Sequence, residues 1–435
     1  MAGEKGANNN NNDSDNDKPL TLGLRPNINQ FLILVLVNAF VGSMIGMEQT
    51  VVPLIGAKEF DIQSNALIVS FIASFGLVKA ILNLFAGKIS DKWSRKNVLI
   101  LGWLFGIPVP IILLVAPDWN WIIVANVFLG INQGLAWSMT VNMKIDLVGK
   151  EKRGFALGFN EFSGYFAVSI VGFVTGYIAS IYGLKPYPFY FGIVFAVLGL
   201  LISWLIVKDT RKFTLLEIRR QDEDTPVESN DDVNLNRNLD FVKVFLYTSW
   251  KDRSLFAISQ SGLVNNLIFG VSWGLFTLYF SSYGLGTSDV GFLKALHPGI
   301  WGILQLVTGF MSDKIGRKIL IFPGMFIQSI GVWIILYSQE FVGWVLGMAL
   351  LGSGTALVYP TLLAAIGDIA HPNWRATSLG VYRFWRDMGF VIGAIGIGYI
   401  ADLFGMFIAI QIVALIGIAS GIVVIFLMKE TKNKK

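Results

Sequence analysis

GKISDKWSRK at residues 87–96 and GFMSDKIGRK at residues 309–318 are two copies of one pattern, separated by an offset of 222 residues. The same offset aligns LGFNEFSGYFAVSIVGFVTGYIA, which starts at Leu157, with LGVYRFWRDMGFVIGAIGIGYIA, which starts at Leu379. The matches fall on Gly, Asp and Arg, not on interchangeable apolar residues, so a single shared offset indicates an internal duplication. The sequence therefore predicts two homologous halves, one around each copy.

The sequence on either side of the two copies is strongly apolar. Of the 435 residues 54% are hydrophobic and 14% are charged, and the mean hydropathy is +0.61. A helix needs about 20 apolar residues to cross a hydrocarbon core about 30 Å thick. The predicted spans are residues 29–55, 65–86, 97–116, 121–143, 154–180, 187–207, 255–282, 289–310, 319–338, 341–366, 376–402 and 405–428. We therefore expect an all-α membrane protein with twelve transmembrane helices in two pseudo-symmetric six-helix bundles.

Polar segments divide this chain into regions. The first residues are rich in Asn and Asp, a composition typical of a disordered tail, and a long polar segment separates the sixth span from the seventh. The predicted regions are an N-terminal tail (1–28), an N-terminal six-helix bundle (29–207), a cytoplasmic linker (208–253), a C-terminal six-helix bundle (254–428) and a cytoplasmic tail (429–435).

The distribution of Lys and Arg predicts the orientation. With both termini inside, the external loops hold only Lys58 and Lys185, and basic residues near span ends are retained on the cytoplasmic side. We expect a multi-pass protein of the plasma or inner membrane, and a monomer. The net charge of +5 then reflects topology and requires no nucleic-acid partner. The chain has no Cys and two His, so we expect no disulfide, metal site or cofactor.

The pattern G-x-x-S-D-x-x-x-R-K after the second span, repeated after the eighth, resembles the signature loop of the major facilitator superfamily. The frame of twelve spans around a long central linker is similar to that superfamily over residues 29–428. The resemblance implies a transporter with two bundles that works by alternating access. It also implies that spans 1, 4, 7 and 10 line a central cavity and that spans 2, 5, 8 and 11 form gates.

The repeated loops also predict a cytoplasmic gate. Their glycines permit close helix packing, and their acidic and basic residues are suited to ion pairs that latch an outward-open state. The alternative is static capping together with the positive-inside bias. The residues predicted for this gate are Gly87, Asp91, Arg95, Asp146, Arg153, Gly309, Asp313, Arg317, Asp368 and Arg375.

Two acidic residues within spans are candidates for proton coupling, because an ionisable side chain in a span costs about 2.5 to 3.5 kcal/mol on insertion scales. Glu48 resembles the acidic residue, followed by Thr and Pro, in the first span of many drug/proton antiporters. It could instead reach the external interface. Glu161 is equivalent to Arg383 under the repeat, which predicts a salt bridge between the halves. The alternative is an Arg383–Asp387 pair within one helix, which leaves Arg386 to find another partner.

Other polar residues within the spans are candidates for the solute cavity, because amides orient a ligand and aromatic rings bury its surface. Each of the uncharged ones could instead serve as a helix–helix hydrogen bond. The predicted cavity residues are Asn38, Lys79, Asn132, Gln133, Trp137, Asn265, Asn266, Trp273, Lys294, His297, Tyr359, Arg383, Arg386 and Asp387. The deeper charges balance at +1, which favours an anionic solute over a cationic or neutral amphiphile by one charge.

The sequence also departs from family patterns. Gly130 stands where proton-coupled members carry Arg in R-x-x-Q-G, and span 5 lacks the Gly-Pro step of antiporters. The main hypothesis is a secondary active transporter of a small organic solute, coupled to a proton or solute gradient. The alternatives are a drug/proton efflux antiporter for amphiphilic compounds and a solute sensor that does not transport. No pattern typical of an enzyme was found.

Overall fold

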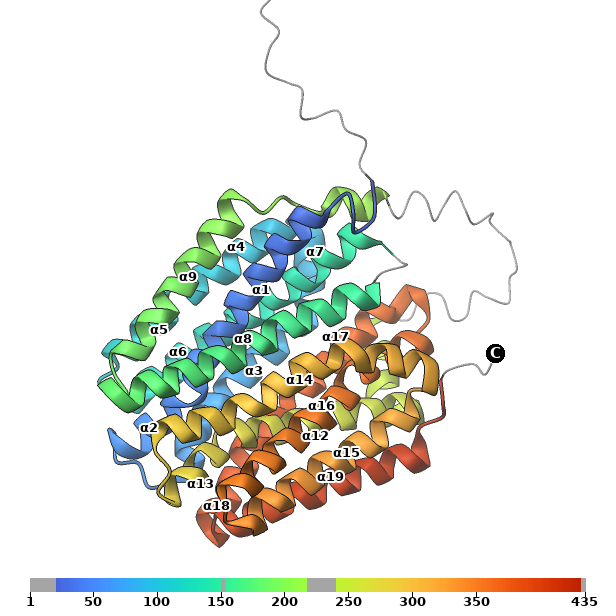
Figure 1. Cartoon of the computed structure of the whole chain (residues 1–435). Helices are drawn as coiled ribbons and strands as arrows, with labels where there is room; N and C mark the ends of the chain where they lie inside the picture. Colours follow the sequence, from blue (N-terminus) through green and yellow to red (C-terminus); the bar gives the residue numbers. More distant parts are fainter. Residues whose placement is uncertain (1–20, 150–152, 217–239, 432–435) are drawn as a thin grey trace, which may run out of the picture.

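The computed structural model describes residues 21–149, 153–216 and 240–431, which form helices and connecting turns without any strand (Figure 1). The first half contains α1 (Ile28–Gln49), α2 (Val51–Lys58), α3 (Asn65–Lys92), α4 (Arg95–Gly106), α5 (Pro108–Val115), α6 (Trp119–Asn132), η1 (Gln133–Trp137), α7 (Ser138–Val148), α8 (Arg153–Tyr182) and α9 (Tyr187–Leu205). The second half contains α11 (Phe241–Leu246), η4 (Tyr247–Lys251), α12 (Arg253–Trp273), α13 (Leu275–Ser282), α14 (Thr287–Ile315), α15 (Lys318–Ser338), α16 (Phe341–Ile369), α17 (Pro372–Ile392), η5 (Gly393–Ile397), α18 (Gly398–Phe404) and α19 (Met406–Leu427).

The described residues contain 12 helical segments long and apolar enough to cross a membrane, which confirms the predicted fold class. Large apolar side chains cover the outside of the molecule, and Phe426, for example, is 80% exposed. Such a surface is typical of contact with lipid, since a soluble protein rarely exposes large contiguous apolar patches. The chain is therefore a multi-pass membrane protein.

Several spans consist of two helices that meet at a break. Span 1 combines α1 and α2, and Pro53 lies in the first turn of α2. The N–H groups of a first turn have no partner within the helix, so the N–H that proline lacks costs no helical hydrogen bond there. Pro108 is the first residue of α5 and separates it from α4 in the same way. Spans 4 and 11 contain the π-helical turns η1 and η5, and such turns are frequent at functional sites.

Three helices continue five or six residues beyond the predicted span ends. Spans 2, 4 and 8 were expected to end at residues 86, 143 and 310, but α3 continues to Lys92, α7 to Val148 and α14 to Ile315. The added turns carry charged side chains, which lower the local hydropathy without stopping a helix. The predicted linker also contains helical structure, because α11 and η4 lie within it and Trp385 Nε1 of α17 donates to Ser249 Oγ at 2.8 Å.

The two bundles lie side by side, with the blue-to-green helices of the first half against the yellow-to-red helices of the second (Figure 1). Small residues let the facing helices approach closely. A Cβ added at Gly176 of α8 would lie 2.9 Å from the Cα of Gly291 of α14. About two turns before Gly176 in α8, Ser169 Oγ donates to the carbonyl of Ala295 at 2.7 Å. This part of the interface therefore has no room for larger side chains.

The packing between the bundles differs at the two ends of the molecule. At the end predicted to be external, the carboxylate of Asp402 accepts hydrogen bonds from Ser64 Oγ at 2.6 Å and from the backbone N–H of Asn65 at 2.5 Å. At the opposite end, a Cβ at Gly158 of α8 or at Gly309 of α14 would meet no described atom within 4 Å. The bundles are thus closed at the predicted external end, whereas these two glycines at the opposite end have open space beside them.

Candidate functional site

A charged cavity of about 240 Å³, including the part open to solvent, lies between the two bundles. Its walls come from α3, η1, α7 and α8 of the first half and from α16 and α17 of the second. The lining residues are Lys79, Asn83, Trp137, Ser138, Glu161, Tyr359, Arg383 and Arg386. All except Asn83 and Ser138 belong to the residues predicted for the cavity or for proton coupling.

Glu161 is bonded to both halves of the molecule. Its Oε1 accepts from Trp137 Nε1 at 2.8 Å and from Asn160 Nδ2 at 3.1 Å. Its Oε2 accepts from the hydroxyl of Tyr359, in the other half, at 3.0 Å, and Arg386 Nη1 donates to that hydroxyl at 2.7 Å. The predicted ion pair between Glu161 and Arg383 is wrong, because the Tyr359 hydroxyl takes the position across the interface.

Asp387 is fully buried and is neutralised by its neighbour in sequence. Arg386 donates through Nε at 3.0 Å and through Nη2 at 2.8 Å to Asp387 Oδ1. Asn266 Nδ2 donates to the same oxygen at 3.2 Å, and Asn83 Nδ2 donates to Oδ2 at 2.5 Å. The alternative pair between Arg383 and Asp387 is therefore also wrong. Asp387 lies against α12, whereas Arg383, one turn earlier, lies on the cavity wall.

Lys79 is 4% exposed and has no acidic partner within ion-pair distance among the described residues. Its ammonium group lies 5.2 Å from the centre of the Phe75 ring, 5.5 Å from Trp137 and 6.0 Å from Phe390. Contacts of this kind stabilise a cation through the negative face of the ring. The interpretation that Lys79 points inward is consistent with its place in the cavity wall.

Lys144 was not predicted as part of the site. A basic residue near the end of a span is expected to serve topology, but Lys144 is fully buried and its Nζ donates to Asn160 Oδ1 at 2.6 Å. Through Asn160 it is joined to Glu161. A signal was present, because Trp137 and Lys144 are seven residues apart and so share one face of a helix.

Lys294 and His297 form a separate buried cluster away from the cavity. Lys294 Nζ contacts the carbonyl of Ser272. His297 Nδ1 lies 3.2 Å from Ser272 Oγ, and its Nε2 lies 3.1 Å from Thr355 Oγ1. This cluster joins α12, α14 and α16 within the second half.

Four predicted amides lie in contacts between helices and do not line the cavity. Asn38 Nδ2 donates to the carbonyl of Asn160 at 2.6 Å, Asn132 Nδ2 to that of Gly102 at 3.0 Å, Gln133 Nε2 to that of Val41 at 2.7 Å, and Asn265 Oδ1 accepts from Gln328 at 3.1 Å. Trp273 packs edge to face on Phe71 and Phe75. These amides therefore form hydrogen bonds between helices, which was the alternative to a place in the cavity.

Glu48 lies apart from the cavity. Its side chain is fully buried, so it does not reach the external interface. Neither carboxylate oxygen makes a well-formed hydrogen bond among the described residues, although the Asn126 side chain lies close to it. Since a charged carboxylate without partners is costly to bury, this environment favours the neutral acid. No group of three potential metal ligands occurs in the described ranges.

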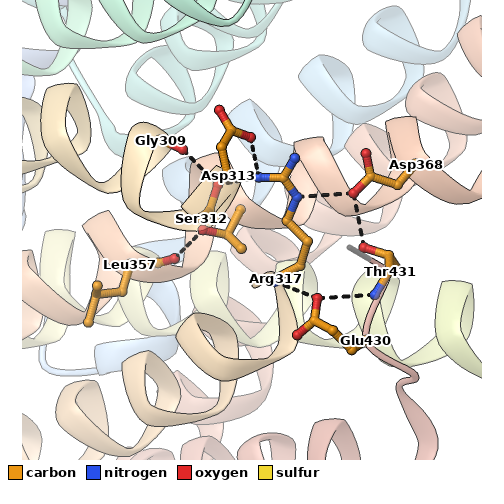
Figure 2. A network of polar contacts seen from close by, with 9 residues as sticks. Gly309, Ser312, Asp313, Arg317, Leu357, Asp368, Glu430 and Thr431 are labelled. Atoms are coloured by element: carbon orange, nitrogen blue, oxygen red, sulfur yellow. Dashed lines mark hydrogen bonds and ion pairs between the residues drawn. The ribbon is translucent and has the colours of Figure 1, made fainter. Parts of the chain in front are cut away.

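The second copy of the repeated loop forms the network drawn in Figure 2. Arg317 Nη1 pairs with Asp313 at 2.7 Å, and Arg317 Nε pairs with Asp368 Oδ2 at 3.0 Å. From the C-terminal segment, Thr431 Oγ1 donates to Asp368 at 3.0 Å and Glu430 accepts from the amide of Arg317 at 2.7 Å. Burial opposes the Arg317 charge, but its bonds to Asp368 and Asp313 outweigh that effect and raise the Arg317 pKa.

The first copy has an equivalent arrangement. Arg95 Nε pairs with Asp146 Oδ2 at 2.8 Å, and Thr210 Oγ1 donates to the same oxygen at 2.6 Å. Both networks as described lie within one half, in a conformation that is closed at the predicted external end, so the latch of the outward-open state stays a prediction. Arg375 departs from the predicted network, because its Nε donates to the carbonyl of Ala370 at 3.2 Å and not to Asp368. The side chains of Asp91 and Arg153 and the surroundings of Gly87 lie outside the described part of the chain.

The sequence model of the Major Facilitator Superfamily matches residues 31–386 and, in a second match, residues 258–435. The chain belongs to this superfamily. An uncharacterized MFS-type transporter of Methanocaldococcus jannaschii is 24% identical over 358 residues, which are 80% of this chain and 86% of that protein. The quinolone resistance protein NorA of Staphylococcus aureus is 27% identical over 121 residues, 28% of this chain and 31% of NorA.

Two solved structures with this fold are similar to the chain to nearly the same degree. The inward open conformation of the xylose transporter XylE from E. coli superposes with a TM-score of 0.70 at 15% identity, covering 94% of this chain and 98% of that one. A D-xylose-proton symporter also has a TM-score of 0.70, at 17% identity, covering 94% and 99%. At this identity the likeness establishes the fold.

The cavity of this MFS transporter is lined by other spans than the resemblance implied. The lining residues belong to spans 2, 4, 5, 10 and 11, and none of those described belongs to spans 1 or 7. The reason is that polar side chains of spans 1 and 7 bond to other helices, as Asn38 and Asn265 do.

Proposed function

We propose that this protein moves a small organic solute across the membrane by alternating access, as a secondary active transporter driven by a proton or solute gradient. The observation that supports this most is the charged cavity between the bundles, whose walls come from both halves. A solute bound there contacts both bundles, so rocking of one bundle against the other would carry it from one side to the other. We also propose that both termini are cytoplasmic, and that the monomer is the working unit.

Two carboxyl groups are suited to coupling transport to protons. Glu161 lies in the cavity wall and shares a hydrogen bond with Tyr359 of the other bundle, so separation of the bundles would break that bond. Glu48 is buried without a well-formed hydrogen bond among the described residues. Either group would take up or release a proton as its surroundings change, because the stability of the charged form depends on its donors.

The test is solute flux in proteoliposomes, without ATP, with an imposed pH or solute gradient. We expect the purified wild-type protein to concentrate a solute from a mixed panel of carboxylates, sugars and lipophilic cations. Glu161→Gln and Glu48→Gln are the coupling variants, and exposed Glu59→Gln is the matched control. Gradient-driven accumulation should be lost in at least one coupling variant and kept in the control. Absence of flux for every solute, with folded protein, would contradict the proposal.

A drug/proton efflux antiporter is the second candidate. It is favoured by Glu48, followed by Thr50 and Pro53, and by the partial match to NorA. The same assay separates it from the main proposal. Proton-driven export of a lipophilic cation, abolished by Glu48→Gln, would support the antiporter.

A further inference from the structure

Lys79 and Arg383 line the central cavity from opposite bundles, on α3 and α17. Within the described ranges neither side chain makes a hydrogen bond or an ion pair, although both lie close enough to interact electrostatically. Lys79 is 4% exposed, so little water reaches its charge. Asp387 and Glu161 lie close enough to attract Lys79, but neither forms an ion pair with it among the described residues. A buried cation without a paired anion is costly, and like charges across one interface also repel each other.

The nearby acidic groups already have donors. Glu161 accepts hydrogen bonds from Trp137, Asn160 and Tyr359. Asp387 accepts two from Arg386 and one each from Asn83 and Asn266. Lys144 adds a further buried positive charge beside Glu161. The basic groups at the cavity therefore exceed the acidic ones, and the surplus lies at Lys79 and Arg383.

We propose that the transported solute is a small organic carboxylate whose carboxylate group lies between Lys79 and Arg383. This inference rests on the proposed transport function and specifies its substrate class. Arg offers a planar pair of donors that matches a carboxylate, and Lys adds a point charge. The aromatic rings of Trp137 and Tyr359 provide surfaces for an apolar solute body.

The same geometry links binding to closure. In the structure, Arg383 repels Lys79, although Asp387 and Glu161 attract Lys79 more strongly. A carboxylate between them replaces repulsion by two attractions, one to each bundle. Bound solute then favours the closed interface, which is the differential affinity that a conformational change requires.

The first experiment measures binding by thermal shift, with benzoate and benzamide as probes of nearly equal shape and different charge. Acetate tests a carboxylate without a ring, and tetraphenylphosphonium tests a lipophilic cation. We expect benzoate to stabilise the wild-type protein and benzamide to have no effect. Lys79→Gln and Arg383→Gln should each weaken benzoate binding at least tenfold, whereas exposed Lys58→Gln should leave it unchanged. Lys79→Arg keeps the charge and should retain most of the affinity.

The outcomes separate this inference from the transport proposal. Stabilisation by tetraphenylphosphonium or benzamide and by no carboxylate would overturn the inference, and so would benzoate binding that is equally strong in Lys79→Gln and Arg383→Gln. If proteoliposomes then still accumulate a neutral or cationic solute, the transport function stands without the carboxylate site. If benzoate binding depends on both cations but no gradient drives any flux, the site stands and the transport function fails. If a glutamine variant does not fold, the comparison of benzoate with benzamide on the wild-type protein still decides.

Discussion

The hydroxyl of Tyr359 in α16 donates to Glu161 Oε2 in α8 at 3.0 Å, so this hydrogen bond joins the two bundles at the cavity. Arg386 donates to the same hydroxyl and connects it to Asp387. The contact belongs to a conformation that is closed at the predicted external end, and it has to break when the bundles separate at the cavity.

Tyr359→Phe should therefore shift the conformational equilibrium away from the described state. A hydrogen bond to a charged group contributes about 1.5–3 kcal/mol, which corresponds to a population change of roughly tenfold or more. The chain has no Cys, so spin labels can be placed at Lys58→Cys and Asp289→Cys, one exposed position in each half at the predicted external end. We expect the distance between the labels to lengthen in Tyr359→Phe. An unchanged distance distribution would show that this bond does not hold the interface.

Gly176→Val should have a stronger effect in the same measurement. A Cβ at Gly176 already lies 2.9 Å from Gly291, so valine would force α8 and α14 apart. We expect a longer label distance and reduced transport. The matched control is Gly158→Val in the same helix, where a Cβ would meet no described atom within 4 Å. If Gly158→Val opened the external end as much as Gly176→Val does, the explanation by close packing would be wrong.

Asn83→Ala should destabilise the folded protein. Asn83 donates to Asp387 Oδ2 at 2.5 Å and accepts from Ser138 Oγ at 2.8 Å. Its loss leaves a buried carboxylate oxygen without a donor, which costs about 1–3 kcal/mol. Thermal unfolding in detergent measures the loss, with exposed Asn120→Ala as the control. If Asn83→Ala and Asn120→Ala unfold at the same temperature, Asn83 does not stabilise the protein as described.

Asp146→Asn should be more destabilising than Asp368→Asn, although the two residues are equivalent under the repeat. The Asp146 side chain is 8% exposed and that of Asp368 is 31% exposed. Removing one partner of a buried pair costs about 3–5 kcal/mol, whereas exposed pairs contribute about 0–1 kcal/mol. Thermal unfolding of the two variants in parallel measures the difference. A larger loss for Asp368→Asn would show that solvent exposure does not control these networks.

Much of the fold was predictable because span length and the repeat are local or periodic signals. The span number and the close approach of glycine-containing helices follow from apolar length and from the offset of 222 residues. The site was predictable only in part. Lys79 and Tyr359 were identified by their depth in a span, but the partner of a charged residue depends on side-chain direction and on the other bundle. Arg386, not Arg383, therefore turned out to bond Asp387.

Lys144 shows a different reason for error. A basic residue near a span end has two physical explanations, topology and burial, and hydropathy alone does not separate them. The position of Lys144 on the helical face of Trp137 was the information needed. Asn38, Asn132 and Gln133 were predicted for the cavity but lie in contacts between helices. Amides in spans serve ligands and helix contacts equally well, so their position in a span does not separate the two roles.

The duplication has preserved one feature and reversed another. Both halves keep an Arg–Asp–Thr cluster, Arg95–Asp146–Thr210 in one and Arg317–Asp368–Thr431 in the other. At the cavity, however, the equivalent positions hold Glu161 and Arg383. The ancestral two-fold symmetry is thus broken where a solute would bind. A molecule with two different ends should therefore bind in this cavity in one direction only.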